Sequence, residues 1–273
     1  MSDAVALVSV AGALRDATLA LRDAGCDTPR LDAEVLLASV LGVERSRLVV
    51  DAHVELDRSV TARFHALVAR RVAREPVAYI LGRKEFRRIS LSVDRRVLIP
   101  RPETELLVEV GLSLPRGASV VDVGTGSGAV ALALKDERPD LSVVATDVSA
   151  DALAVARENG ARLGLDVSFV QADLLDGVEG SFDAVLSNLP YVASGVYLAP
   201  EIAVYEPPVA LFGGPDGLDL IRRLLSMVTD VPVVALEVGL AEFVASLARE
   251  AGFGSVEILD DLAGHQRVVV ARR

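Results

Sequence analysis

The chain has 273 residues, of which 51% are hydrophobic and 25% charged, so it is long enough for one or two domains with a real core and is not a disordered chain. Its formal net charge of −11 is uneven, because residues 106–273 contain 11 basic and 24 acidic side chains (−13) and residues 77–105 contain 7 and 4 (+3). A tight nucleic-acid binder usually presents a large basic face, so the composition argues against a nucleic-acid partner.

The sequence also argues against a membrane protein and a metalloprotein. The longest uninterrupted apolar run, Ala129–Leu134, is six residues long, which is too short to cross a bilayer. The start, Met1-Ser2-Asp3, lacks the basic region of a secretory signal. The single cysteine, Cys26, cannot form an intrachain disulfide, and the three scattered histidines have no metal-ligand spacing. We therefore expect a soluble cytoplasmic protein with no metal and no membrane partner, and we expect a monomer.

Residues 1–75 are predicted to form a small helical bundle. Apolar residues recur at three- and four-residue intervals as far as Gly25, which ends a first helix. Two further helices are expected at residues 30–41 and 57–74, and the last one ends before Pro76.

Residues 76–101 change character and are predicted to link two domains. An apolar stretch at residues 79–81, a break at Gly82 and the alternating residues 89–93 are typical of a β-hairpin. Pro102 is expected near the start of a helix. The second domain is then predicted to span residues 102–273.

Beyond Ser119, short apolar strands alternate with helices. Strands are expected at residues 120–123, 141–146, 167–170, 182–187 and 231–237, with a closing antiparallel pair at 256–259 and 267–271. Helices are expected from the glycines after the first strand through Lys135, at 150–163 and at 241–251. This alternation predicts the α/β class: a doubly wound, mostly parallel, seven-stranded, Rossmann-like sheet.

A carboxylate and a glycine-rich turn follow the first strand of this sheet. The residues of this motif are Asp122, Gly124, Thr125, Gly126 and Gly128. The glycines allow a tight turn and a close approach of backbone to a ligand, and the following helix N-terminus offers amide donors. With Ala129 the motif also fits a dinucleotide-binding pattern, so it indicates a nucleotide-like cofactor without choosing one.

Two more carboxylates follow the next two strands. Asp147, followed by Val148, is positioned to bind ribose hydroxyls, which suits either kind of cofactor. Asp173, followed by Leu174, can accept a hydrogen bond from an adenine amino group or serve as an ordinary capping aspartate. The spacing leaves both interpretations of Asp173 open.

The fourth strand ends in Asn188-Leu189-Pro190-Tyr191, which we expect to face the cofactor at the strand C-termini. A planar nitrogen is a poor nucleophile, and the Asn188 side-chain carbonyl and the Leu189 backbone carbonyl could bind its two N–H groups as positive charge develops. Tyr191 could stack on the flat group. The motif predicts methylation of an amide or an aniline-like nitrogen without a strong general base.

Several segments resemble the protein-glutamine methyltransferases of the HemK/PrmC type. They are residues 75–86, with Glu-Pro-Val-Ala-Tyr-Ile-Leu-Gly-Arg-Lys-Glu-Phe, residues 97–105, residues 206–218 and the ending at 261–267. The resemblance spans nearly the whole chain and implies S-adenosylmethionine as methyl donor, with S-adenosylhomocysteine as product. It implies as acceptor the glutamine of the Gly-Gly-Gln loop of class I peptide-chain release factors, with the N-terminal bundle as a recognition domain.

The resemblance also implies roles for single residues. The glycines of the turn would line the donor, Asp147 would hold its ribose, and Asp173 would lie near its adenine. Asn188, Pro190 and Tyr191 would hold the acceptor amide. Arg101, Glu103 and Thr104 match the family's segment at the cleft edge and would bind the substrate.

One residue departs from the family pattern. The family usually has Asn-Pro-Pro-Tyr, and this chain has Leu189 at the second position, as in ribosomal-RNA adenine dimethyltransferases. The alternatives are therefore an adenine-N6 methyltransferase acting on RNA or DNA, a methyltransferase with another protein or small-molecule acceptor, or a donor-binding protein with a decayed site. A dinucleotide oxidoreductase is disfavoured because no residue downstream is suited to hydride transfer.

Overall fold

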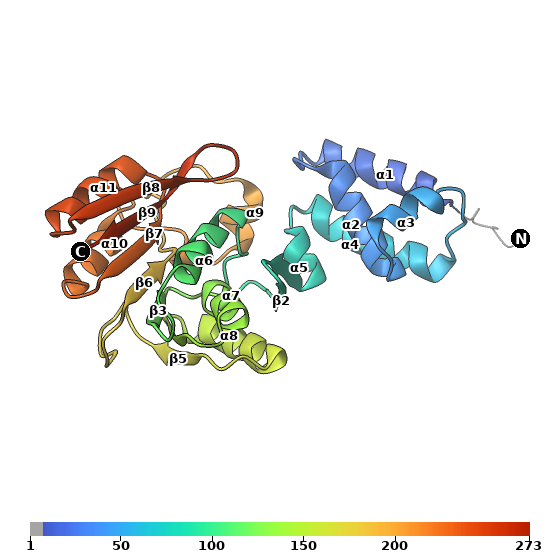
Figure 1. The fold of residues 1–273 in the computed structure, drawn as a ribbon. Helices are drawn as coiled ribbons and strands as arrows, with labels where there is room; N and C mark the ends of the chain where they lie inside the picture. Colours follow the sequence, from blue (N-terminus) through green and yellow to red (C-terminus); the bar gives the residue numbers. More distant parts are fainter. Residues whose placement is uncertain (1–7) are drawn as a thin grey trace, which may run out of the picture. The chain divides into compact units, whose positions relative to one another are not determined.

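The computed structural model describes residues 8–273, so the first three residues used above to argue against a secretory signal lie outside it. The chain forms two compact units (Figure 1). The first comprises the described residues up to Gly82 together with Pro200–Tyr205, and the second comprises Arg83–Ala199 and Glu206–Arg273.

Among its described residues, the first unit consists of helices and their connections, with a single antiparallel bridge between Ser9 and Glu55. Its helices are α1 (Val10–Asp23), α2 (Pro29–Leu41), α3 (Arg45–Val50), α4 (Arg58–Val72), α5 (Val77–Leu81) and α9 (Pro200–Tyr205). The side chains of Ser9 and Asp57 accept hydrogen bonds from the first turns of α1 and α4, which fixes where those helices begin. Leu21, Leu36 and Phe64 are fully buried in its core. The helices predicted at α1, α2 and α4 are confirmed, and α3, α5 and α9 were not anticipated.

The prediction that the stretch at residues 79–81 begins a hairpin is wrong. Val77–Leu81 is a helix that follows Pro76 and ends at Gly82, whose φ of 69° is left-handed. Tyr79 and Ile80 are buried, so the apolar run is the inner side of a short helix. The hairpin itself is formed by β1 (Arg83–Phe86) and β2 (Ile89–Ser92).

A buried ion-pair network fixes α9 to the helical unit, although α9 is distant in the sequence. Arg71 donates from Nε to Asp32 Oδ2 at 2.7 Å and from Nη1 to Glu201 Oε1 at 2.9 Å. The side chains of Arg71 and Asp32 are only 8% and 9% exposed. Arg74 donates to both oxygens of Glu201, at 2.7 and 2.6 Å. Because these charges are largely withdrawn from water, each depends on its partners.

The second unit contains a seven-stranded sheet with the order β5-β4-β3-β6-β7-β9-β8. The strands are β3 (Ser119–Val123), β4 (Ser142–Asp147), β5 (Ser168–Gln171), β6 (Ala184–Ser187), β7 (Val233–Glu237), β8 (Ser255–Asp260) and β9 (Gln266–Arg272). The first five strands in this order pair in parallel, and β9 pairs antiparallel with both β7 and β8. The predicted fold class is confirmed.

Helices cover both faces of this sheet (Figure 1). They are α6 (Glu105–Leu112), α7 (Ala129–Glu137), α8 (Ala150–Leu163), α10 (Asp219–Met227) and α11 (Ala241–Glu250), with short 3-10 turns at Pro102–Thr104 and Pro208–Ala210. Val121 and Val123 pack in one core cluster with α10 and α11. Asp122, between them in the strand, contacts the first turn of α7. Alternate residues of β3 therefore serve opposite faces.

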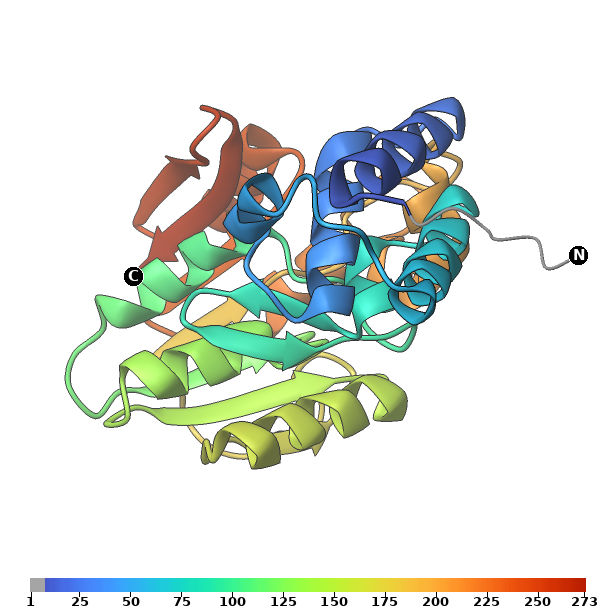
Figure 2. The same ribbon diagram turned by 90° about the vertical axis from the view of Figure 1, so that its right-hand side faces the viewer.

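The β1–β2 hairpin packs on α7 and α8 (Figure 2). Asn159 of α8 is fully buried, accepts from Ser92 N at 2.8 Å and donates to Ser92 O and Ser127 O at 3.0 Å each. One buried amide thus joins the hairpin to the start of α7.

Helix α10 was not anticipated. Among residues 8–273, no helix combines the length and apolarity needed to span a membrane.

The network predicts a difference between two aspartates of the helical unit. Asp32→Ala leaves Arg71 with one of its carboxylate partners missing, and we expect it to lower the free energy of unfolding by about 3 kcal/mol. Asp51→Ala removes the partner of Arg47 in a pair whose arginine side chain is 59% exposed, and we expect a loss below about 1 kcal/mol. Urea unfolding of the full chain followed by circular dichroism measures both, and equal losses would contradict the assigned role of the network.

Candidate functional site

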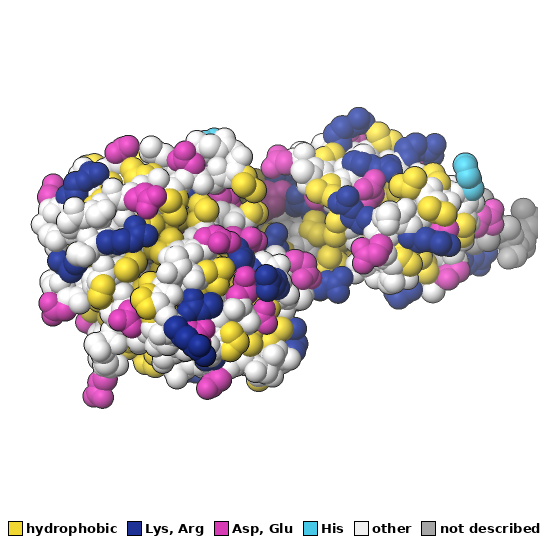
Figure 3. Space-filling model, viewed as in Figure 1, with side chains coloured by type: hydrophobic (Ala, Val, Ile, Leu, Met, Phe, Trp, Pro, Cys, Tyr) yellow, Lys and Arg dark blue, Asp and Glu magenta, His cyan; other side chains and the backbone are white. Residues whose placement is uncertain are grey.

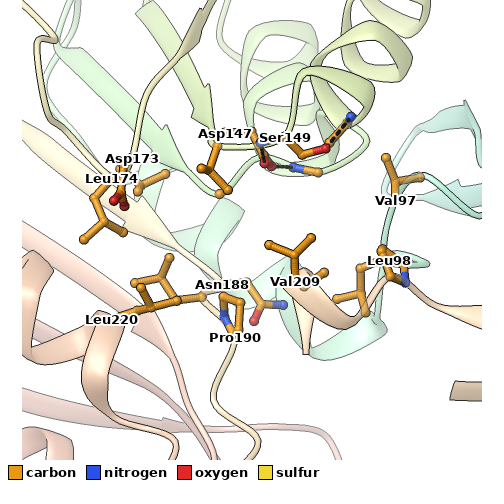
Figure 4. Close-up of a pocket in the computed structure, with 18 of the residues that line it drawn as sticks. Val97, Leu98, Asp147, Ser149, Asp173, Leu174, Asn188, Pro190, Val209 and Leu220 are labelled. Carbon is orange, nitrogen blue, oxygen red and sulfur yellow. Dashed lines mark hydrogen bonds between the residues drawn. The ribbon is translucent and has the colours of Figure 1, made fainter. Parts of the chain in front are cut away.

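A cavity of about 320 Å³ lies at the C-terminal ends of β3, β4 and β6. This volume is within the range of roughly 300–1,000 Å³ that is typical of small-molecule sites. Nine of the residues expected to act there line it: Gly124, Gly126, Asp147, Val148, Asp173, Leu174, Asn188, Leu189 and Pro190. Figure 4 shows Asp147 and Asn188 on opposite sides of this cavity. A smaller cavity of about 50 Å³ adjoins it under the glycine turn.

The glycine turn is held by hydrogen bonds to the neighbouring strand. The amides of Gly124 and Thr125 donate to the Thr146 carbonyl at 2.9 Å each, and Gly126 N donates to Asp147 Oδ2 at 2.9 Å. Gly126 has a φ of +56°, and a Cβ built there would meet no atom within 4 Å. Its requirement for glycine therefore comes from the left-handed backbone rather than from crowding within the protein.

Asp122 holds the turn rather than facing the main cavity. Its Oδ2 accepts from Thr125 Oγ1 at 2.6 Å and from Ala131 N at 3.2 Å. Burial raises the pKa of Asp122 to about 6, and the hydrogen bonds from Thr125 and Ala131 oppose that shift. Asp122 and Thr125 line the smaller cavity. The sequence analysis expected both residues at the cofactor, and the structure places them on the smaller cavity rather than on the main one.

Asp147 combines a structural contact with exposure to the cavity. One oxygen accepts from Gly126 N and the other from Ser149 N, at 2.9 Å each. Burial raises the pKa of Asp147, and these backbone hydrogen bonds oppose the rise. A carboxylate has about four acceptor positions, so Asp147 can still accept from hydroxyl groups of a ligand in the cavity.

Asp173 and Leu174 lie on the wall next to α10. Asp173 Oδ2 accepts from Arg223 Nη2 at 2.9 Å, and both side chains are about half exposed. Leu174 has a φ of +58°, a backbone conformation that costs a non-glycine residue about 1–2 kcal/mol. Its carbonyl accepts from the buried hydroxyl of Thr146 at 2.9 Å. The Thr146 hydroxyl therefore helps to hold this unfavourable backbone conformation at the cavity wall.

The tetrapeptide after β6 is anchored from both sides. Ser187 Oγ donates to the Val123 carbonyl at 2.6 Å, and Asn188 Nδ2 donates to Thr104 Oγ1 at 3.2 Å. Leu189 is 4% exposed and belongs to the core cluster of the sheet. The aromatic ring of Tyr191 packs against Gly239, where a Cβ would lie 3.3 Å from Tyr191 Cδ2. Tyr191 lines neither cavity, and burial raises the pKa of its phenol.

The three residues expected to bind the substrate do not meet at one point. Arg101 Nη2 donates to Glu206 Oε1 at 2.6 Å, and Arg101 and Thr104 line the small cavity. Glu103 lines a separate cavity beside Asp261. Burial raises the pKa of Glu206, whose side chain is 1% exposed, and Arg101 opposes that rise.

Part of the cavity wall was missed by the sequence analysis. The missed residues are Arg96, Val97, Leu98, Val123, Ser149, Ala152, Ala172, Pro207, Val209, Ala210, Phe212, Leu220 and Arg223. Figure 4 shows Val97, Leu98 and Val209 on the side of the cavity away from Asp173. Residues 96–98 and 207–212 lie in segments outside the strand–helix repeat, so no periodicity marks them. Except for Arg96, these residues lie within the segments 97–105 and 206–218, whose resemblance to the family is the one signal in the sequence.

Comparisons with known proteins decide the family. The model of the PrmC N-terminal domain matches residues 12–82, and the model of the methyltransferase small domain matches residues 102–202. A release factor glutamine methyltransferase from Caulobacter vibrioides is 41% identical over 264 residues, covering 92% of this chain and 91% of that protein. One from Deinococcus radiodurans is also 41% identical, covering 95% and 97%.

The chain belongs to the release factor glutamine methyltransferase family. A solved methyltransferase structure from Pyrococcus furiosus is 22% identical and has a TM-score of 0.53. The match covers 67% of this chain and 87% of that one and supports the methyltransferase fold. Membership implies that this methyltransferase uses S-adenosylmethionine. The cavity fits such a donor, since it joins a left-handed glycine turn to carboxylates at two strand ends. Within residues 8–273, no three His, Cys, Asp or Glu side chains are grouped as a metal site.

Gly128 has a packing role that can be tested. It lines neither cavity, its φ is +85°, and a Cβ there would lie 2.8 Å from Leu132 Cδ1 and 3.4 Å from Ala156 Cβ. We expect Gly128→Ala to cost about 2–4 kcal/mol of stability, from overpacking plus backbone strain. Gly164→Ala is the matched control, because Gly164 has a φ of +68° with no atom within 4 Å of a Cβ, and about 1 kcal/mol is expected. Urea unfolding measures both variants, and equal losses would show that packing at Gly128 is unimportant.

Proposed function

We propose that this methyltransferase transfers a methyl group from S-adenosylmethionine to the side-chain amide nitrogen of the glutamine in the Gly-Gly-Gln loop of a class I peptide-chain release factor. The observation that carries the proposal is the position of Asn188 on the donor cavity, with its Nδ2 bonded to Thr104. That bond leaves the side-chain carbonyl of Asn188 for an acceptor N–H. The names of the relatives support the same acceptor.

Different residues would bind the ribose, the adenine and the amino-acid end of the donor. Asp147 would accept from the ribose hydroxyls, and Asp173 lies where it could accept from the adenine amino group. Gly124 and Gly126 would lie along the donor, and the small cavity beside Arg101 would take its amino-acid end, where the guanidinium offers charge to a carboxylate. Val148 and Leu174 would supply apolar contacts to the nucleoside.

The acceptor is activated by hydrogen bonding rather than by a base. The lone pair of an amide nitrogen is delocalised, so it attacks only when the group is held and its N–H bonds are polarised. Asn188 Oδ1 and the Leu189 carbonyl would accept these two N–H groups as positive charge develops on nitrogen. Pro190, on the cavity wall, would help to hold the flat amide in an orientation that permits in-line attack.

The proposed step balances without another reagent. The amide nitrogen forms a bond to the methyl carbon as the bond between that carbon and sulfur breaks, and the electron pair of that bond stays on sulfur. The products are S-adenosylhomocysteine and a cationic N-methyl amide. The latter loses one proton to solvent to give the neutral methylated glutamine.

Leu189, the departure from the family pattern, has a packing explanation. Its side chain is buried with the sheet core, and one methyl group is 3.4 Å from the position of a Cβ on Gly124. The proposed role of this position uses only its backbone carbonyl, so leucine is compatible with an amide acceptor. A nucleic-acid acceptor is disfavoured by the −13 charge of residues 106–273. The face in Figure 3 carries interspersed basic and acidic side chains rather than one continuous basic surface.

In this proposal each part of the chain has a separate role. Residues 1–75 would recognise the release factor, 76–101 would link, and 102–273 would carry donor and chemistry, with Glu103 available to the bound protein. Release factors act where translation ends, so we expect the enzyme in the cytoplasm, and we expect it to act as a monomer.

Asn188→Ala tests the proposed chemistry. We expect kcat for methylation of a purified release factor to fall by about 100- to 1,000-fold, because one preorganised acceptor is lost. The Kd for S-adenosylmethionine, measured by calorimetry, should change little. The assay follows radiolabel from the donor, and a release factor whose acceptor glutamine is replaced by glutamate is the control. Labelling of RNA or DNA without labelling of any release factor would overturn the proposal.

Asp147→Ala tests the donor site. Removing a carboxylate that accepts hydroxyl hydrogen bonds and holds Gly126 should weaken donor binding by about 10- to 100-fold. Asp151, exposed in the first turn of α8, does not line the cavity. Asp151→Ala should therefore bind the donor as the parent does. Equal calorimetric Kd values for the two variants would show that Asp147 does not bind the donor.

A further inference from the structure

A buried carboxylate that belongs to none of the sequence motifs lies behind the tetrapeptide. Glu237 is the last residue of β7 and is 2% exposed. It accepts a hydrogen bond from the side chain of Thr104. Its Oε2 is buried and, within the described part of the chain, has no hydrogen-bond partner. A buried carboxylate with an unpaired oxygen is costly, so its presence calls for a function.

The sheet places this carboxylate next to the reacting tetrapeptide. Ser187 of β6 pairs with Leu236 of β7, so Asn188 and Glu237 follow at the same edge of the sheet. Thr104, at the start of α6, is 5% exposed and bonds to both of them. The three side chains form one hydrogen-bonded series, which runs from the Asn188 amide through the Thr104 hydroxyl to the Glu237 carboxylate.

The direction of the hydrogen bonds in this series follows from which groups can donate and which can only accept. An ionised carboxylate only accepts, so Thr104 must give its single hydroxyl hydrogen to Glu237. The Thr104 oxygen can then only accept from Asn188, which must present its NH₂ group and not its carbonyl. The two ends of an asparagine amide have nearly the same shape, so packing alone would not select one orientation.

We propose that Glu237 and Thr104 are positioning residues that lock the Asn188 amide with its carbonyl oxygen available to the acceptor. The inference rests on the proposed function. In the opposite orientation, Asn188 would present N–H donors to the N–H groups of the acceptor, and the amide would be repelled. Glu237 itself touches neither cavity and therefore acts only through Thr104.

The charge state of Glu237 makes the lock sensitive to pH. Burial raises the pKa of Glu237 to about 7; Glu103 adds to the rise, while Thr104, Arg267 and Arg101 oppose it. The phenol of Tyr191 also lies close enough to interact with this carboxylate. Above pH 7 the carboxylate is ionised and only accepts. Below pH 7, the carboxyl O–H of Glu237 can donate to Thr104, and the direction of the hydrogen bonds from Asn188 to Glu237 is no longer fixed.

Conservative variants separate positioning from packing. Thr104→Val keeps the shape of the side chain but removes the hydroxyl, and we expect kcat on a release factor to fall about 10- to 100-fold, as for loss of a hydrogen bond to a charged network. Thr104 also lines the small cavity, so the donor Kd is measured alongside, and we expect it to change by much less than kcat because Arg101, Gly124, Gly126 and Asp147 are untouched. Thr104→Ser restores the hydroxyl and should recover most of the lost kcat.

Glu237→Gln distinguishes a positioning role from a purely structural one, because only a positioning role predicts a change in the pH dependence of kcat. An acid whose folded pKa is raised stabilises the fold only at low pH, and that contribution is lost as pH rises through the folded value near 7. At pH 8 the glutamine variant should therefore unfold at no lower a temperature than the parent. Its kcat should nevertheless be lower, and the rise of kcat between pH 6 and 8 should disappear.

The outcomes are distinguishable. If the parent methylates a release factor and Thr104→Val keeps the parental kcat, the positioning role is wrong. A parental pH profile for Glu237→Gln would overturn it equally, whether or not Thr104→Val folds. If the parent methylates no release factor, the proposed function fails and takes this inference with it.

Discussion

The parallel register of four neighbouring strands is the constraint on which the site depends. β4, β3, β6 and β7 pair so that their carboxyl ends reach the same edge of the sheet. The residue at or just beyond each end is Asp147, Gly124, Asn188 and Glu237, in that order across the sheet. No two of these are close in sequence, and only the ladder brings them together. A slip of one residue in β4, β6 or β7 would turn Asp147, Asn188 or Glu237 to the other face.

Carboxylates withdrawn from water recur around this edge, and each one holds another group. Asp122 holds the glycine turn, Asp147 holds the turn and faces the donor cavity, Glu206 holds Arg101, and Glu237 holds Thr104. Burial is the largest cause of the raised pKa of all four. Their desolvation opposes folding, and the hydrogen bonds they accept offset only part of it. In the proposed mechanism, these carboxylates fix the polar groups that meet donor and acceptor before either binds.

The sequence predicted those features that depend on local pattern. Alternating strands and helices gave the sheet, the glycine turn and Asp147, and the strand before Asn188 placed that residue at the cavity. What it missed depends on contacts between distant segments. The apolar run at Val77–Leu81 suited a strand as well as a helix, and the cavity wall at residues 207–212 has no periodicity. Glu237 ends a core strand, and its importance is visible only when Thr104, more than a hundred residues earlier, is placed beside it.

In the proposed mechanism, the acceptor amide nitrogen is held by the Asn188 carbonyl, whose orientation is fixed by Thr104 and Glu237. A crystal structure with S-adenosylhomocysteine and a release factor tests this directly. We expect the glutamine Nε2 to lie within hydrogen-bond distance of both Asn188 Oδ1 and the Leu189 carbonyl, with Asn188 Nδ2 still bonded to Thr104. A glutamine amide that binds elsewhere in the cavity, or an Asn188 that turns its NH₂ group toward the acceptor, would contradict it.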